Sequence, residues 1–313
     1  MDKQPLHITN GDVLTNVLND LDVEGVKLTW QELLCEGPTS EEVFSKEFLE
    51  ARKLFFEQFY GIDLDFELIK IELDKLNNSE NYSEIVLWFE YDLFCHINMI
   101  AVISLIKQKK IDLPIYLVCS GRIAGSKRLK GLGELKPNQL LNHYKKKVLL
   151  NEEDIDMATT IWSIYCGIDH NLLKPYIVKS SSFEYLSNCL KAHLKRFPDS
   201  IDGLSILGRH ILEIIKKEKI TSKNHLLGYA LNYQGYYGYG DLQFKRIIEN
   251  LSIFYLVSED CIELNRKGHE ALLAQHNYAL ELNDNMTFGG VKKIDFLFNV
   301  SENKLVKSTL NAN

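Results

Sequence analysis

The chain has 313 residues, of which 45% are hydrophobic and 25% are charged, so it can build one large globular domain or two ordinary ones. Its formal net charge of −7 disfavours non-specific binding to nucleic acid, which depends on a cationic surface. No run of about 18 apolar residues predicts a membrane span, and no signal peptide precedes the first strand. Six scattered cysteines without a CxxC pair favour reduced thiols. We therefore expect a cytoplasmic protein.

Strands and helices are predicted to alternate over the first 120 residues. Short strands are expected at 6–9, 26–30, 85–90 and 115–119, where apolar residues cluster between turn signals. Helical spacing is found at 13–21, 40–61, 65–78 and 92–109, and Ser40 is the expected N-cap of the second helix. Strand 85–90 is almost continuously apolar, as in a parallel strand that helices cover on both faces. We therefore predict a small Rossmann-like α/β domain over residues 1–136.

The remaining residues, 137–313, are predicted to form a mainly helical C-terminal domain. Helical patterns dominate up to about residue 250, interrupted by one biased segment, "YQGYYGYGD" (233–241). Two short strand-like pieces follow, then a helix from 267 to about 280, and the alternating segments "VKKIDFLFNV" and "NKLVKS" predict a terminal β-hairpin. Helices, a helix-turn-helix spacing and a hairpin in this order resemble a winged-helix arrangement.

Polar and acidic residues gather at the predicted carboxyl ends of the four strands, where open α/β sheets bind their ligands. In chain order they are Thr9, Asn10, Gly11 and Asp12; Trp30, Glu32 and Glu36; Glu90, Tyr91 and Asp92; and Ser120, Gly121 and Arg122. The candidate catalytic carboxylates are Asp12, Glu32, Glu90 and Asp92, and the other residues are candidate ligand contacts. Carboxylates crowded at one edge repel one another unless a cation or a cationic ligand compensates. They can hold a divalent metal, act as acid–base groups or bind an amine, and Mg²⁺ is a candidate cofactor, held by Asp12, Glu90 and Asp92.

Turn formation and helix capping are the alternative roles for these residues. Asp12 and Asp92 stand at helix starts, where a carboxylate accepts hydrogen bonds from free N–H groups, and the Asn-Gly pair before Asp12 is typical of a turn. Cys95 and His96 follow one turn later, on an apolar helix, and are expected to be core residues. A Cys–His nucleophile pair is not expected, because adjacent helix positions do not face each other.

The functional interpretation makes a geometric prediction for this edge of the sheet. Asp12 and Glu90 should lie within about 10 Å of each other, because neighbouring strands lie about 4.8 Å apart. They should face a cleft that Trp30 and Glu32 also line. Asp12→Asn should then leave folding almost intact, since Asn caps nearly as well as Asp, and should abolish ligand binding.

Several segments resemble a bacterial family catalogued as domain of unknown function 1835. The clearest are "HITNGD", "LTWQELLCEGP" and "LWFEYDLFCHINMIAVISLI"; looser ones are "FPDSIDGLSILGRHILEII", "YGYGDLQFKRIIENL", "LNRKGHEALL" and "FGGVKKIDF". The resemblance implies an α/β domain followed by a helical, winged-helix-like part, and it brings no reaction. Tyr91, Cys95 and His96 depart from the His, Asp and Gln that are common at these places in the family.

Two classes of function fit these observations. The first is an enzyme, a hydrolase or transferase, that binds a small-molecule or nucleotide-type ligand at the carboxyl edge, with Trp30 as a stacking surface. The second is a ligand-sensing regulator whose winged-helix-like part contacts nucleic acid or protein. The segment "ITSKNHLLGYALNYQ", its candidate recognition helix, has a single cationic residue, Lys223. We therefore favour the enzyme; a pure interaction module would leave the carboxylates unexplained.

Overall fold

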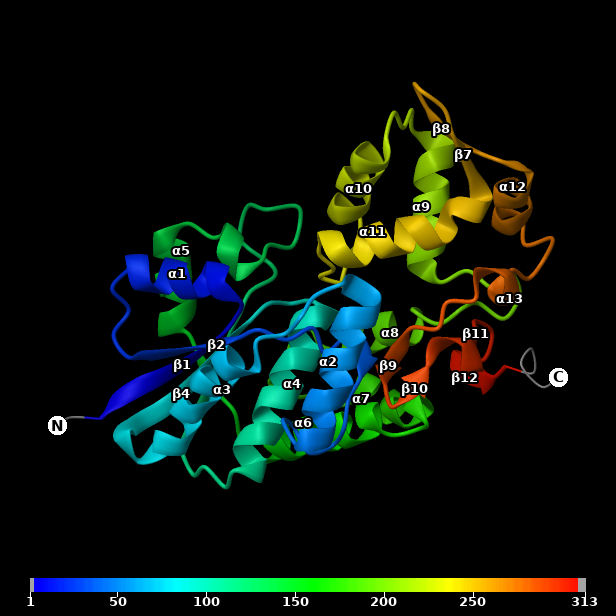
Figure 1. The fold of residues 1–313 in the computed structure, drawn as a ribbon. Coiled ribbons are helices and arrows are strands. Elements are labelled where there is room, and N and C mark those ends of the chain that lie inside the picture. The colour runs from blue at the N-terminus through cyan, green and yellow to red at the C-terminus, as the bar shows by residue number, and fades with distance from the viewer. Residues whose placement is uncertain (1–2, 309–313) are drawn as a thin grey trace.

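A computed structural model describes residues 3–308 and contains a five-stranded sheet at its N-terminal end (Figure 1). The strands are β1 (Gln4–Asn10), β2 (Val26–Trp30), β4 (Tyr82–Phe89), β5 (Ile115–Cys119) and β6 (Val148–Leu149). Their spatial order is β2-β1-β4-β5-β6. The four predicted strands are parallel, and the fifth, β6, is antiparallel to β5. The sheet thus continues past residue 136, where the first domain was predicted to end.

Helices cover both faces of this sheet and build the rest of the molecule (Figure 1). In the N-terminal part they are α1 (Asp12–Asp20), α2 (Lys46–Tyr60), α3 (Phe66–Asp74) and α4 (Leu93–Gln108). They are followed by α5 (Pro137–Lys145), α6 (Glu152–Cys166), α7 (Lys174–Val178), α8 (Leu186–Leu194), α9 (Ile206–Lys217), α10 (Lys223–Asn232), α11 (Asp241–Asn250), α12 (Arg266–Leu272) and α13 (Ala279–Leu282). Short 3₁₀ segments include Lys75–Asn81 and Leu132–Glu134.

Alternate side chains of β4 enter two separate cores, as expected of a strand with period two. Val86 and Trp88 pack with residues of α1 and α5 on one face of the sheet. Ile85, Leu87 and Phe89 belong to the main core, which includes α4 on the opposite face. The apolar run in β4 is therefore explained by helices on both sides.

Helix α4 is buried on every side. The six residues predicted to form its buried face are Leu93, Ile97, Ile100, Ala101, Ser104 and Leu105, and all six are buried. Met99, Val102 and Ile103, which point in other directions, are buried as well. The one-sided stripe was too narrow a prediction, because α6 and α8 pack against α4 on the side away from β4.

Among the described residues, no helix is long and apolar enough to cross a lipid bilayer.

The segment between β2 and α3 departs from the prediction at the start of α2. Helix α2 begins at Lys46, and its N-cap is Ser45, five residues after the predicted N-cap Ser40. Phe44 has a φ of 60°, which interrupts the helical backbone before that point. Ser45 Oγ accepts a hydrogen bond of 3.2 Å from the N–H of Phe48 and so starts the helix.

The C-terminal part combines helices with three small β structures. Helices α9 to α12 and the antiparallel pair β7 (Tyr255–Val257) and β8 (Ile262–Leu264) form the upper right of Figure 1. The predicted terminal hairpin is confirmed as β11 (Phe296–Asn299) and β12 (Lys304–Lys307). The helix predicted from 267 to 280 is instead divided into α12 and α13, because Ala274 adopts a φ of 53°.

A short parallel strand pairing joins the N-terminal part of the chain to its C-terminal part. Strand β3 (Gly37–Pro38) pairs with β9 (Thr287–Gly289), which also pairs with β10 (Val291–Lys292). Residues near the start of the chain are thus held by residues near its end, so the C-terminal part packs closely against the α/β sheet.

Candidate functional site

Three candidate residues lie directly after β4 at the carboxyl edge of the sheet. Asp92 is the N-cap of α4, and its Oδ1 accepts a hydrogen bond of 2.8 Å from the N–H of Cys95. Glu90 Oε1 accepts one of 3.2 Å from the N–H of Gly133, in the loop that follows β5. Tyr91, between them, packs edge-on against Tyr185. The predicted capping role of Asp92 is confirmed, and Glu90 is held by backbone from another segment.

Two glycines allow loops to close over these carboxylates. A Cβ on Gly131 would lie 2.3 Å from Glu90 Oε2, and a Cβ on Gly238 would lie 2.1 Å from Asp92 Cγ. Gly238 belongs to the Tyr- and Gly-rich segment 233–241, whose carbonyls also accept hydrogen bonds from the first N–H groups of α4. This biased segment therefore lies over the start of α4, next to Asp92.

Replacing Gly238 by alanine should lower the free energy of unfolding more than the matched change Gly235→Ala. Both glycines have a φ near +67°, so both variants share the same backbone strain. A Cβ on Gly238 would also collide with Asp92, whereas a Cβ on Gly235 would meet nothing within 4 Å. We expect an extra loss of about 1–3 kcal/mol, as for other overpacked sites, measured by denaturant unfolding. Equal losses would show that the loop is free to move away from Asp92.

A cavity of about 400 Å³ lies between these elements. Its lining comes from the end of β4 (Glu90, Tyr91, Asp92), the loop after β5 (Arg128, Leu129, Gly131, Glu134) and the C-terminal part (Leu231, Asn232, Gln234, Gly235, Gly238, Tyr239). Most of these groups are polar or charged. Arg128 pairs with Glu134 at 2.5 Å and keeps 71% of its side chain exposed. The cavity is thus a polar site between the sheet and the C-terminal part.

Two carboxyl groups at this cavity, Glu90 and Asp92, have raised pKa values. Burial, followed by the charge of Asp92, raises the pKa of Glu90 to about 7. Burial also raises the pKa of Asp92 to about 6, although the hydrogen bond from Cys95 opposes this shift. The pKa of Tyr91 rises to about 12 for the same reasons. Glu90 can therefore accept or donate a proton near neutral pH.

The residues at this edge do not fit the Mg²⁺ site that we expected. Glu90, Asp92 and Cys95 each offer one atom, and these three atoms lie within 4.8 Å of one another. Mg²⁺ requires a near-octahedral set of oxygen ligands, and the third donor here is a thiol. Burial raises the pKa of Cys95 well above its usual value, and its Sγ accepts a hydrogen bond of 3.1 Å from Asn10. Asp12 is not part of this group.

Strand β1 ends in a hydrogen-bonded turn that contacts α4. Asn10 Oδ1 accepts a hydrogen bond of 2.9 Å from Asn98 of α4, and Gly11 N–H donates to the carbonyl of Trp30 at 3.0 Å. Gly11 has a φ of 94° and is the N-cap of α1. Thr9 is fully buried, and its hydroxyl bonds that of Thr15 at 2.5 Å. Thr9, Asn10 and Gly11 therefore fix the backbone here.

Asp12 and Trp30 line a different cavity from Glu90. This second cavity has a volume of about 180 Å³, and Glu32 also lines it. Asp12 is exposed, and its Oδ1 accepts a hydrogen bond of 2.7 Å from Gln31. Trp30 and Glu32 are 3% and 6% exposed. The candidate residues that were expected around one cleft thus lie around two cavities, on either side of the end of β1.

Glu32 is paired with a buried arginine, and Glu36 is paired with a partly buried one. Glu32 Oε2 lies 2.9 Å from Arg52 Nη2, and both side chains are almost fully buried. Glu36 Oε1 lies 2.9 Å from Arg246 of α11. The hydroxyl of Tyr60 donates to the other oxygen of Glu36. Glu36 is thus part of a network that joins the sheet to the C-terminal part.

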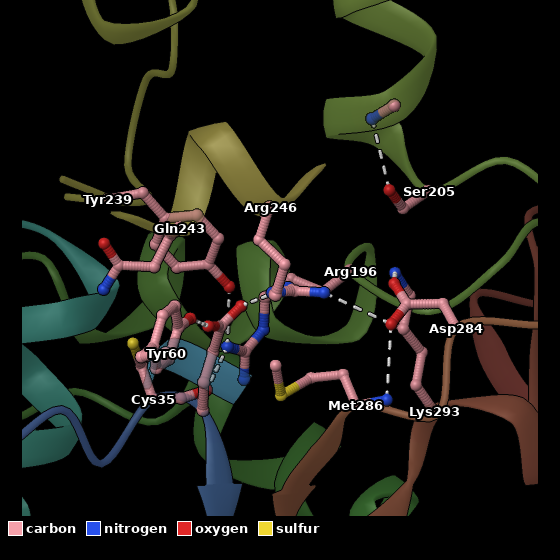
Figure 2. A network of polar contacts seen from close by, with 12 residues as sticks. Cys35, Tyr60, Arg196, Ser205, Tyr239, Gln243, Arg246, Asp284, Met286 and Lys293 are labelled. Carbon is pink, nitrogen blue, oxygen red and sulfur yellow. Dashed lines mark hydrogen bonds and ion pairs between the residues drawn. The ribbon is translucent and has the colours of Figure 1, made fainter. Parts of the chain in front are cut away.

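Figure 2 shows this network around Arg246. Arg246 Nη1 lies 3.3 Å from Asp284, and Asp284 in turn pairs with Lys293 at 2.5 Å. The two cations hold the pKa of Asp284 below its usual range, although burial opposes this shift. The geometry makes Glu36 a structural residue rather than a ligand contact.

The candidates after β5 have mixed environments. Ser120 is buried, and its hydroxyl has no hydrogen-bond partner among the described residues. Gly121 packs against the ring of Tyr185, whose hydroxyl accepts a hydrogen bond of 2.9 Å from the N–H of Arg122. The side chain of Arg122 is exposed. These contacts fix the start of the loop that reaches Glu90.

The sequence reasoning missed the residues that close the cavity from the C-terminal side. Gln234, Gly238 and Tyr239 lie about 150 residues from Glu90 in the chain and line the same cavity. The unusual composition of the segment 233–241 was the available signal. Glycines in "KGLG", residues 130–133, were a second signal, because they permit close backbone approach.

Similarity to known proteins is found among solved structures, and not among family models or curated proteins. No family model matches the sequence, and the comparison with curated proteins finds no match. Among solved structures, the chain is similar to the DNA-binding, cleavage and re-ligation domain of topoisomerase II from Plasmodium falciparum. The TM-score is 0.45 and the sequence identity 13%, over 79% of this chain. The chain spans 42% of the length of that chain.

Proposed function

We propose that the protein is an enzyme that binds a small-molecule or nucleotide-type ligand in the cavity beside Glu90. The observation that carries this proposal is a carboxyl group with a pKa of about 7 in a polar cavity of about 400 Å³. A general acid–base works best when its pKa lies near the operating pH. Perturbed pKa values in a cleft are a recognised sign of a functional site.

The roles of the surrounding groups follow from their contacts. Glu90 is the proton acceptor and donor, and Asp92 is a positioning residue whose charge raises the pKa of Glu90. Arg128, exposed at the rim, offers a cation to an anionic group of the ligand. The reaction class that suits such a site is hydrolysis or group transfer. We also propose that the chain belongs to the family of domain of unknown function 1835, on the segments quoted above.

Glu90→Gln should slow turnover strongly and change the pH dependence of stability. The raised pKa means that folding favours the protonated carboxyl, so the wild type loses stability as the pH rises from about 4.5 to about 7. Each pKa unit corresponds to about 1.4 kcal/mol. Gln cannot ionise, so this part of the pH dependence should disappear while the fold remains. Turnover should fall by about 10²–10⁴-fold, the usual contribution of a general acid–base.

A thermal-shift screen of nucleotides, small metabolites and divalent metals identifies the ligand first, because a ligand of the folded state raises the melting temperature. The matched control is Glu57→Gln, an exposed residue on α2 that does not line the cavity. A ligand that stabilises the wild type, Glu57→Gln and Glu90→Gln equally, and is turned over equally by all three, would refute the role of Glu90. Stabilisation by Mg²⁺ alone would contradict our conclusion that Glu90, Asp92 and Cys95 do not suit this ion.

A ligand-sensing regulator is the second candidate, and one observation favours it. Helices α9, α10 and α11 precede the hairpin β7–β8, and Ile220, between α9 and α10, forms a bridge to Ile262 of β8. This order supports a winged-helix-like arrangement. The cavity beside Glu90 touches this region at Leu231 and Asn232, the last two residues of α10. Ligand binding there would therefore change the contacts of α10 and could shift the position of this helix relative to α9 and α11.

The surface of this region fits a protein partner better than nucleic acid. Lys223, the cation of the candidate recognition helix, pairs with Glu249 at 2.5 Å. Arg246 of α11 points to Glu36 and is unavailable to phosphates. The hairpin exposes Leu256 and Val257 rather than cationic residues. The ligand itself separates the two functions, because an enzyme converts it and a regulator releases it unchanged.

A further inference from the structure

A cationic loop, residues 121–131, follows β5 and forms one wall of the polar cavity of about 400 Å³. Its base is closed by a hydrogen bond of 2.9 Å from the N–H of Lys130 to the carbonyl of Gly121. Within the loop, the hydroxyl of Ser126 donates to the carbonyl of Arg128 at 2.7 Å. The loop is therefore held in a defined shape by its own hydrogen bonds.

The loop carries positive charge without an acidic residue of its own. In a chain whose net charge is −7, residues 121–133 contain no Asp or Glu and four cations: Arg122, Lys127, Arg128 and Lys130. The first three are exposed, and Lys130 is half-buried. Within the described part of the chain, Arg128 alone of the four forms an ion pair. Like charges on one closed loop disfavour one another, so an anion that binds there is stabilised.

Arg128 lies at the rim of the cavity. It is a lining residue, and its Nη2 donates to Oε2 of Glu134, a second lining residue. Glu134 is itself held, because its Oε1 accepts a hydrogen bond of 3.0 Å from the N–H of Gly131. The Arg128 side chain remains 71% exposed, and a guanidinium has five N–H donors. Arg128 therefore keeps donors for the oxygens of an anionic ligand.

Positive and negative groups come from different walls of this cavity. Glu90 and Asp92 belong to the end of β4, whereas the cations belong to the loop after β5. Glu134, the third acid of the lining, is already paired with Arg128. The lining residues from the C-terminal part carry no charged side chain. A ligand that matches both walls is therefore anionic at one end and offers a hydroxyl or amine proton at the other.

We propose that the loop 121–131 binds the phosphate of a phosphate monoester, whose hydroxyl-bearing sugar enters the cavity toward Glu90. A phosphate carries about two negative charges and three acceptor oxygens, so it suits several cations better than a carboxylate does. Arg128 pairs with two of these oxygens, since a guanidinium matches phosphate bidentately. The cavity, of about 400 Å³, has the volume of a typical ligand site. The place of the sugar rests on the proposed function of Glu90, and the phosphate contact rests on the loop.

The test compares two phosphate monoesters with their uncharged parents on the whole chain: ribose 5-phosphate with ribose, and AMP with adenosine. Isothermal titration calorimetry gives the four affinities, and ³¹P NMR follows the phosphate directly. We expect at least one ester to bind with a Kd below about 10 mM and about tenfold more tightly than its parent. The ester that binds more tightly distinguishes a sugar phosphate from a nucleotide. No saturable binding of either ester, or equal binding of ester and parent, would overturn the proposal.

Arg128→Gln should weaken binding of the ester by about tenfold, because it removes charge-assisted hydrogen bonds to the phosphate. The matched control is Lys145→Gln on α5, which removes one positive charge from an exposed residue outside the cavity lining. This control should leave the affinity unchanged. Equal losses in the two variants would show a general effect of net charge and would overturn the proposal.

Glu90→Gln separates this inference from the proposed function. The variant should still bind the ester, because the phosphate contacts remain and the new amide also accepts a hydrogen bond from a hydroxyl. Binding that requires Arg128, without turnover in the wild type, would refute the enzyme and support the phosphate site. Turnover of an uncharged parent that Arg128→Gln leaves unchanged would support the enzyme and overturn the phosphate site.

Discussion

Ile100→Asp is expected to abolish the folded state of the protein. Ile100 is fully buried in α4, which packs against the sheet on one side and against α6 and α8 on the other. An aspartate there has no cation to pair with, and an unpaired buried charge costs several kcal/mol. Proteins of this kind have a total stability of about 5–15 kcal/mol. Circular dichroism and thermal melting should show loss of the cooperative transition.

The control for this variant is Ile71→Asp on α3. This variant makes the same substitution on a helix, but Ile71 is 59% exposed, so the new aspartate remains in contact with water. We expect a change within about 0.5 kcal/mol, as for other surface positions. A normal melting curve for Ile100→Asp would mean that α4 is not a core helix, which would also remove the support for Asp92 and Glu90.

The sheet was predictable because its strands carry local signals. Each of the four predicted segments is a short apolar run between turn residues, and continuous apolarity at Leu87 and Trp88 already indicated cover on both faces. The pairing of β3 with β9 was not predictable. It involves two residues on one side and more than 240 residues of intervening chain, so no periodicity marks it.

The candidate site was only partly predictable, because strand ends locate an edge and not the direction of side chains. Glu90 and Asp92 were found from their position after β4, and the C-terminal lining of their cavity comes from a segment with no periodic pattern. Glu36 looked like a ligand contact because Arg246, its partner, lies in a helix 210 positions later. An arginine in an amphipathic helix is normally solvated, so nothing in the sequence indicates that only 17% of the Arg246 side chain is exposed.

Glu36→Gln is the second variant for which we expect a large effect. The carboxylate side chain is 1% exposed and pairs with Arg246, whose side chain is 17% exposed. Removing one partner of a buried ion pair leaves the other charge uncompensated, which costs about 3–5 kcal/mol. Asp284 still contacts Arg246 and keeps the loss toward the lower end of this range. Denaturant unfolding measures the change, and hydrogen exchange in α11 should increase with it, because α11 loses its contact with the sheet side.

The control is Glu249→Gln, on α11 like Arg246. Glu249 is exposed and pairs with Lys223 of α10. Exposed pairs contribute about 0–1 kcal/mol, so this variant should unfold almost as the wild type does. A double-mutant cycle with Arg246→Gln isolates the contact between Glu36 and Arg246 from the other bonds that each side chain makes. We expect a coupling of at least about 1 kcal/mol, since both groups are largely buried. Additive losses would show that the two parts of the chain are held by the pairing of β3 with β9 and by apolar packing instead.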